Sequence, residues 1–128
     1  MSVAVPIVWD VSTHLQVGRC GEAAAERLYV GRGYRVVSRN WRCGLGELDL
    51  VLRRGDTLVI CEVKSRRGSR FGGAYEAVDA RKRQKLRAVA EVFLRSATSL
   101  PDQVRFDVAS VLVGRDGSAS VEVFEDAF

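Results

Sequence analysis

A strongly apolar strand-like segment near the middle of the chain most constrains how it can fold. Leu-Val-Ile-Cys at residues 58–61 runs into Glu62-Val63-Lys64, and an earlier apolar segment, residues 47–52, precedes it across the turn signal Arg54-Gly55-Asp56. A strand that is apolar on both faces has to be covered on both sides by other layers. The sequence therefore predicts a hairpin whose second strand lies at the centre of a sheet with helices on both faces.

Hydrophobic periodicity predicts the other elements. Apolar positions at helical spacing predict helices over residues 18–32 and 77–97, and β-branched or aromatic runs predict strands over residues 34–41, 105–113 and 120–124. The order αβββαββ predicts an α/β fold in a single domain, residues 14–128, with a central mixed sheet flanked by helices. We expect residues 1–13, which show no clear period, to form a flexible N-terminal arm, and residues 65–75 to form a mobile loop.

Composition narrows the class of protein. With 128 residues, 47% of them hydrophobic and 28% charged, the chain suits one globular domain rather than a disordered or collagen-like one. Three cysteines without a Cys-x-x-Cys pair, together with the single histidine His14, make no convincing zinc set and favour a cytoplasmic location. No stretch approaches the roughly 18–20 apolar residues that span a bilayer, so we expect no membrane partner.

Positive charge is concentrated in one part of the chain. The net charge is +4, yet residues 64–87 hold nine basic residues against two acids, and residues 88–128 hold three against seven. Taken alone, the run at residues 81–87 is best interpreted as a solvated helix face. The neighbouring basic, glycine-containing loop favours a surface that contacts phosphates.

Asp49, Glu62 and Lys64 are the residues that carry chemistry. Side chains alternate along a strand, so Glu62 and Lys64 share a face, and a hairpin centred on Arg54-Gly55 would place Asp49 opposite Ile60 with Glu62 on the diagonal. Two neighbouring carboxylates repel each other and favour a divalent cation such as Mg²⁺ or Mn²⁺ between them. A nearby ammonium group can orient the attacking water. The pattern predicts a phosphodiester-hydrolysing centre, although Glu62 and Lys64 alone would be read as an ordinary ion pair at a sheet end.

The chain resembles the YraN family, uncharacterised protein family 0102, within the PD-(D/E)XK restriction-endonuclease-like superfamily. The resemblance covers about residues 15–113 and rests on Gly18-x-x-Gly21-Glu22, Gly33-Tyr34, Asn40-Trp41-Arg42, Gly46-Glu47-Leu48-Asp49-Leu50, Glu62-Val63-Lys64-x-Arg66, Phe71-Gly72, Ala77-Val78, Lys82 and Arg105-Phe106-Asp107-Val108. Leu48 departs from the superfamily motif, in which a proline precedes the first aspartate. The metal-binding carboxylate itself is kept.

The resemblance implies a restriction-endonuclease-like domain with its acidic set present. The related archaeal Holliday-junction resolvases add a glutamate from the first helix, and Glu22 holds the matching place here. Its alternative interpretation is an exposed acid near a helix start, where a carboxylate suits the helix dipole. Glu47 shares a strand face with Asp49 and is expected either to support the site or to hold Arg42 or Arg66.

The remaining candidates are expected to contact nucleic acid. They are Arg66, Arg67, Arg70, Arg81, Lys82 and Lys85 for phosphates, with Phe71 as a candidate for stacking on a base. Lys82 and Gln84 lie near the start of the second helix, where a solvated face is favoured over a position in the site. Trp41 and Cys61 are expected to pack, Asp107 to pair with an arginine, and His14 to be exposed.

We therefore expect a Mg²⁺-dependent endonuclease acting on DNA, with branched or flap-containing DNA as a candidate substrate. Asp49 and Glu62 would hold the metal, the Val63 carbonyl is a candidate third ligand, and no nucleotide cofactor is expected. One alternative is a non-catalytic nucleic-acid-binding module of the same fold, and another is a protein-interaction domain with a basic surface. A homodimer would span two strands of a junction, but no sequence feature identifies an interface.

Overall fold

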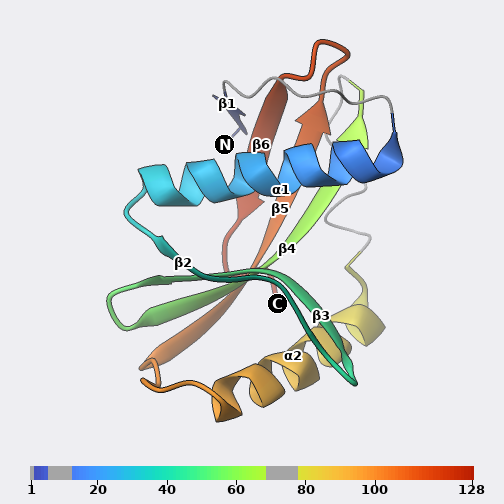
Figure 1. The fold of residues 1–128 in the computed structure, drawn as a ribbon. Helices are drawn as coiled ribbons and strands as arrows, with labels where there is room; N and C mark the ends of the chain where they lie inside the picture. The colour runs from blue at the N-terminus through green and yellow to red at the C-terminus, as the bar shows by residue number, and fades with distance from the viewer. Residues whose placement is uncertain (1, 6–12, 69–77) are drawn as a thin grey trace.

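The computed structural model describes residues 2–5, 13–68 and 78–128, which form a six-stranded mixed sheet with one helix on each face (Figure 1). In chain order the elements are β1 (Ser2–Val5), α1 (His14–Gly31), β2 (Arg35–Cys43), β3 (Gly46–Arg54), β4 (Thr57–Arg67), α2 (Ala80–Arg95), β5 (Gln103–Val113) and β6 (Ala119–Phe124). The strands lie in the order β1-β6-β5-β4-β3-β2. This is the α/β architecture that the sequence predicts.

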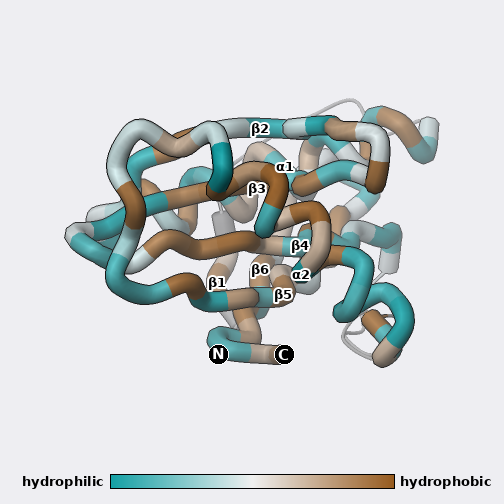
Figure 2. Tube along the Cα trace, turned by 90° about the horizontal axis from the view of Figure 1, so that it is seen from below, coloured by the Kyte–Doolittle hydropathy of each residue, from teal (hydrophilic) through white to brown (hydrophobic). Residues whose placement is uncertain are grey.

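Strand β4 lies inside the sheet and is buried on both faces, as its apolar run predicts. It pairs in parallel with β5 and antiparallel with β3. Val59, Cys61 and Val63 pack beneath α1, while Leu58 and Ile60 pack beneath α2. Figure 2 shows the hydrophobic residues gathered along β3, β4 and β5, with hydrophilic residues towards the turns. Two separate cores, one on each face, therefore fix the position of β4.

Helix α1 begins four residues earlier than the periodicity predicts because a capping box starts it. The Thr13 side chain accepts a hydrogen bond from the Gln16 backbone N–H, and the Gln16 side chain accepts one from the Thr13 backbone N–H. Helix α2 is likewise capped by Asp79, whose carboxylate accepts the Lys82 N–H at 2.9 Å. No helix in the described parts of the chain is long and apolar enough to cross a membrane.

Two segments form strands where the sequence predicts an arm and a loop. Ser2–Val5, assigned to the flexible arm, pairs with β6 as an edge strand, a short segment whose partner is distant in sequence. Residues 65–67, assigned to the mobile loop, continue β4 because the parallel ladder with β5 runs on to Arg67 and Val113. Residues 6–12 and 69–77 lie outside the described residues.

The β3–β4 hairpin has a different register from the predicted one. Leu50 pairs with Cys61 and Arg54 pairs with Thr57, which leaves Gly55 and Asp56 as a two-residue turn. Gly55 has φ +60°, the positive value that a type II′ hairpin turn needs at its first position. The turn centre therefore lies one residue later than predicted. Continued one residue beyond the last pair, Leu50–Cys61, this register puts Asp49 level with Glu62 instead of Ile60.

A buried polar network fastens β5 to α1 and to the C-terminal segment. Asp107 is fully buried and accepts hydrogen bonds from the Tyr29 hydroxyl at 2.6 Å, from Arg105 at 2.9 Å and from the Asp126 N–H at 3.0 Å. Charge-assisted bonds of this kind offset the cost of burying a carboxylate. The prediction that Asp107 pairs with an arginine is confirmed.

Candidate active site

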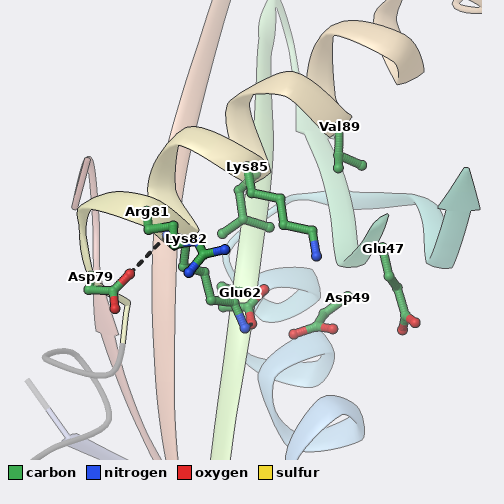
Figure 3. A pocket seen from close by; sticks show the side chains of 9 residues that line it. Glu47, Asp49, Glu62, Asp79, Arg81, Lys82, Lys85 and Val89 are labelled. Carbon is green, nitrogen blue, oxygen red and sulfur yellow. Dashed lines mark hydrogen bonds and ion pairs between the residues drawn. The ribbon is translucent and has the colours of Figure 1, made fainter. Parts of the chain in front are cut away.

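Strands β3 and β4 separate just beyond the Leu50–Cys61 pair, and this fork is the centre of the site. From that point β3 continues beside β2 to Gly46, while β4 continues beside β5 to Arg67. An open cleft of about 560 Å³ lies between the fork and α2 (Figure 3). Its lining residues are Glu47, Asp49, Glu62, Asp79, Arg81, Lys82, Lys85, Leu86 and Val89.

Asp49 is held in the fork by the backbone of β4. Its Oδ2 accepts a hydrogen bond from the Val63 N–H at 2.9 Å. Burial and then the charge of nearby Glu62 raise the pKa of Asp49 from 3.8 to about 7, although the bond from Val63 opposes the shift. The carboxylate is therefore poorly compensated and would gain from a nearby cation.

Glu62 is 6% exposed and is compensated by two lysines. Its Oε1 lies 2.8 Å from the Lys82 Nζ and 3.4 Å from the Lys64 Nζ. Lys64 shares the β4 face with Glu62, as the strand alternation predicts, whereas Lys82 reaches the carboxylate from α2. The solvated-face interpretation of Lys82 is therefore wrong, because the first turn of α2 packs over the fork. Gln84 is exposed, as favoured.

The pKa of Lys64 is lowered and the pKa of Lys82 is raised relative to an ordinary lysine. Burial and the neighbouring Lys82 lower the pKa of Lys64, and this effect outweighs its attraction to Glu62. Burial also acts to lower the pKa of Lys82, but its hydrogen bond to Glu62 and its contact with Lys64 raise it overall.

Glu22 approaches the same cluster from the opposite helix. It lies eight residues after the start of α1, at His14, so the interpretation as an acid at a helix start does not hold. Burial raises the pKa of Glu22, the side-chain hydrogen bond with Asn40 lowers it, and the charges of Glu47 and Glu62 raise it further. The electrostatic influence of Glu47 and Glu62 shows that Glu22 belongs to the same acidic neighbourhood.

Asn40 is a residue of the site that the sequence interpretation did not single out. It has φ +49° on β2, a conformation in which asparagine is more readily accommodated than most residues. The sequence signal was present only as part of the Asn40-Trp41-Arg42 motif.

Across the β2–β3 hairpin, the Glu47 carboxylate lies 2.9 Å from the Arg42 Nε, and Arg42 is one of the two arginine partners that the sequence predicts for Glu47.

The expected phosphate-binding residues fall into two groups. Arg81, Lys82 and Lys85 line the cleft from α2 (Figure 3). Arg66 and Arg67 are exposed at the end of β4, beyond Glu62 and Lys64. Arg70 and Phe71 lie outside the described residues.

The expectations that Trp41 and Cys61 pack and that His14 is exposed are confirmed. Trp41 makes an edge-to-face contact with Phe93, with 5.2 Å between ring centroids, and Cys61 is buried in the core under α1. His14 is exposed. All three cysteines are free thiols.

The donor set at the fork fits a hard divalent cation. Within the described residues no three Asp, Glu, His or Cys side chains gather into a complete metal site. Mg²⁺, however, commonly binds through one or two carboxylates and keeps several waters. Asp49 and Glu62 supply the carboxylates. The N–H and C=O of a strand residue point to the same side, so the Val63 carbonyl points to the same edge of β4 as the N–H that Asp49 binds.

The sequence comparisons identify the family. The sequence model of a protein family, described as "Uncharacterised protein family UPF0102", matches residues 21–111 of this chain. The chain belongs to this family. A UPF0102 protein of Frankia alni is 49% identical over 114 residues, covering 88% of this chain and 93% of its own length. One of Ectopseudomonas mendocina is 43% identical over 119 residues, covering 92% and 98%. The UPF0102 match spans Glu22, Asp49, Glu62, Lys64 and Lys82.

Proposed function

We propose that this UPF0102 protein is a metal-dependent endonuclease that hydrolyses DNA phosphodiester bonds. The observation that supports it best is the grouping at the fork, where Asp49 binds the N–H of Val63, the residue after Glu62, and two ammonium groups contact Glu62. Both lysines contact Glu62, whereas Asp49 is bonded to a backbone N–H and its pKa is raised. A divalent cation between the two carboxylates would supply the positive charge that Asp49 needs, and would bind a phosphate oxygen at its open positions.

Asp49, Glu62 and the Val63 carbonyl are the groups that would hold Mg²⁺ or Mn²⁺. When bound, such an ion lowers the pKa of a coordinated water and offsets the negative charge on the scissile phosphate. The high pKa of Asp49 supports this assignment, since its carboxylate is the one with least compensation in the metal-free protein.

The protein side chains then have separate tasks. Lys64 orients the attacking water and stabilises the charge that develops on the phosphate, and its lowered pKa suits exchange of a proton with that water. Glu22, held by Asn40, completes the acidic set from α1. Arg81, Lys82 and Lys85 on α2, with Arg66 and Arg67 at the end of β4, contact the DNA backbone.

The proposal includes the cytoplasm as the compartment, which suits the three free thiols. We further propose that DNA is the partner, that branched or flap DNA is the substrate, and that the protein acts as a homodimer.

The test is cleavage of labelled single-stranded, duplex, flap and four-way-junction DNA in Mg²⁺, Mn²⁺ or EDTA. We expect cutting in either metal, none in EDTA, and at least a hundredfold lower rates for Asp49→Asn and Lys64→Met, the size of effect typical of catalytic groups. Arg95→Met removes a positive charge from the far end of α2 and serves as the matched control.

Two outcomes would contradict the proposal. Absence of cutting on every substrate, with DNA binding retained, would indicate a nucleic-acid-binding module of nuclease fold. Absence of both cutting and DNA binding, with tight binding to one acidic protein, would indicate an interaction domain.

A further inference from the structure

Two ammonium groups contact the Glu62 carboxylate, although one positive charge would be enough to neutralise it. Both lysine ammonium groups approach the same oxygen, Oε1, with Lys82 0.6 Å nearer than Lys64. The carboxylate is 6% exposed, so water screens these charges poorly. Two cations held at one oxygen repel each other, and a third cation at the same carboxylate would add to that repulsion.

The two lysines differ in how they are attached. Lys64 is fixed two residues from Glu62 on the same strand, within the parallel ladder between β4 and β5. Lys82 comes from the first turn of α2, where its backbone N–H is bound by the Asp79 cap. Its side chain is 38% exposed and extends from α2 towards Glu62 (Figure 3), so rotation about its own side-chain bonds is enough to move the ammonium group away from Glu62.

We propose that Lys82 is an exchangeable counter-ion, which neutralises Glu62 in the metal-free protein and moves to the DNA phosphate when a divalent cation binds. The inference rests on the metal site of the proposed function. A divalent cation at Glu62 would repel the ammonium group of Lys82, and a phosphate entering the cleft would offer that group a new partner. Lys82 therefore competes with the metal before DNA binds and cooperates with it afterwards.

An exchangeable counter-ion and a residue that only supports Glu62 predict opposite changes in metal affinity when Lys82 is replaced. Replacing Lys82 by a neutral side chain of similar length removes the competitor, so the metal should bind more tightly in the absence of DNA. If Lys82 merely held Glu62 in place, the same substitution would weaken metal binding.

The experiment is calorimetric titration of the full chain with Mn²⁺ and with Mg²⁺, without DNA. We expect Lys82→Met to bind either ion roughly fivefold to tenfold more tightly than the wild type, as expected on losing one partly screened charge contact. Lys82→Arg keeps the charge and should stay within about twofold of the wild type. Arg95→Met lowers the net charge equally, far from the cleft, and should leave the affinity unchanged.

Unchanged or weaker metal binding by Lys82→Met would overturn the inference, as would equal tightening by Arg95→Met, which would show a general charge effect. Absence of metal binding by every variant would overturn both the inference and the proposed function. Tighter binding by Lys82→Met in a protein that cuts no DNA would support the counter-ion role while the nuclease proposal fails. Circular dichroism of each variant checks that the fold is retained.

Discussion

The two central carboxylates are held by different kinds of partner, and this difference sets their chemistry. Asp49 accepts a backbone N–H, whereas Glu62 contacts two ammonium groups. Sequence alone predicted Asp49, Glu62 and Lys64, because alternation along a strand fixes which side chains share a face. It did not place Lys82 on Glu62 or Asn40 beside Glu22, because those contacts depend on how α2 and β2 pack against the fork.

The raised pKa of Asp49 gives a pH dependence to stability. In EDTA, the folded protein holds a proton on Asp49 up to about pH 7, whereas the unfolded chain loses it near pH 3.8. Between these values the folded state binds more protons, so stability falls as pH rises. We expect the free energy of unfolding of the wild type, relative to Asp49→Asn, to fall by roughly 1–3 kcal/mol from pH 4 to pH 7.5.

Urea unfolding of both proteins at each pH measures this difference. Saturating Mg²⁺ at pH 7.5 should restore stability to the wild type and much less to Asp49→Asn. A difference between the two proteins that stays constant across the pH range would show that Asp49 does not titrate as described.

Helix α1 crosses β4 so closely that glycine is required at the contact. A Cβ on Gly21 would clash with the Ser65 Oγ and lie 2.7 Å from the Ser65 Cβ, whereas a Cβ on Gly18 would meet nothing within 4 Å. This close approach sets the position of Glu22, the next residue.

Two other features at the scale of helices and strands were not predicted from the sequence. Strand β1 is short and pairs with a strand that is distant in sequence, and the hairpin register depends on which residues occupy the turn.

Gly21→Ala and Gly18→Ala form a matched pair that tests this crossing. We expect Gly21→Ala to lower the free energy of unfolding by roughly 1–3 kcal/mol, the usual cost of overpacking, and to reduce DNA cleavage because Glu22 is displaced. Gly18→Ala should be neutral or stabilise by up to about 1 kcal/mol through helix propensity. Urea unfolding measures both, and equal effects of the two substitutions would contradict the close packing.

Across the whole molecule, the basic side chains of α2 meet the acidic fork at one cleft (Figure 3). The clustering of basic residues in the sequence predicted a phosphate-contacting surface, and their position beside the carboxylates became visible only in the fold. The reason is topological: α2 packs against the sheet face that carries Glu62, so its first turn lies beside a residue of β4. Charge composition alone cannot show that contact.

Salt dependence of DNA binding tests this surface. Each phosphate contact adds about 0.9 to the slope of log affinity against log salt for duplex DNA. We expect Arg81→Gln and Lys85→Gln each to reduce the slope by about that amount, whereas Arg95→Gln at the other end of α2 should not change it. Fluorescence anisotropy in EDTA, which prevents cleavage, gives the slopes. Equal slopes for all four proteins would place the DNA elsewhere.

The central claim is that the fork between β3 and β4 performs metal-dependent hydrolysis. The most direct measurement is the single-turnover rate of DNA cleavage in Mg²⁺ by the wild type and Lys64→Met, with DNA affinity measured in Ca²⁺ for the same two proteins. We expect a rate at least a hundredfold lower for Lys64→Met, with affinity within about fivefold, because Lys64 acts on the reacting water rather than on the bulk of the DNA. An unchanged cleavage rate in Lys64→Met would contradict the account.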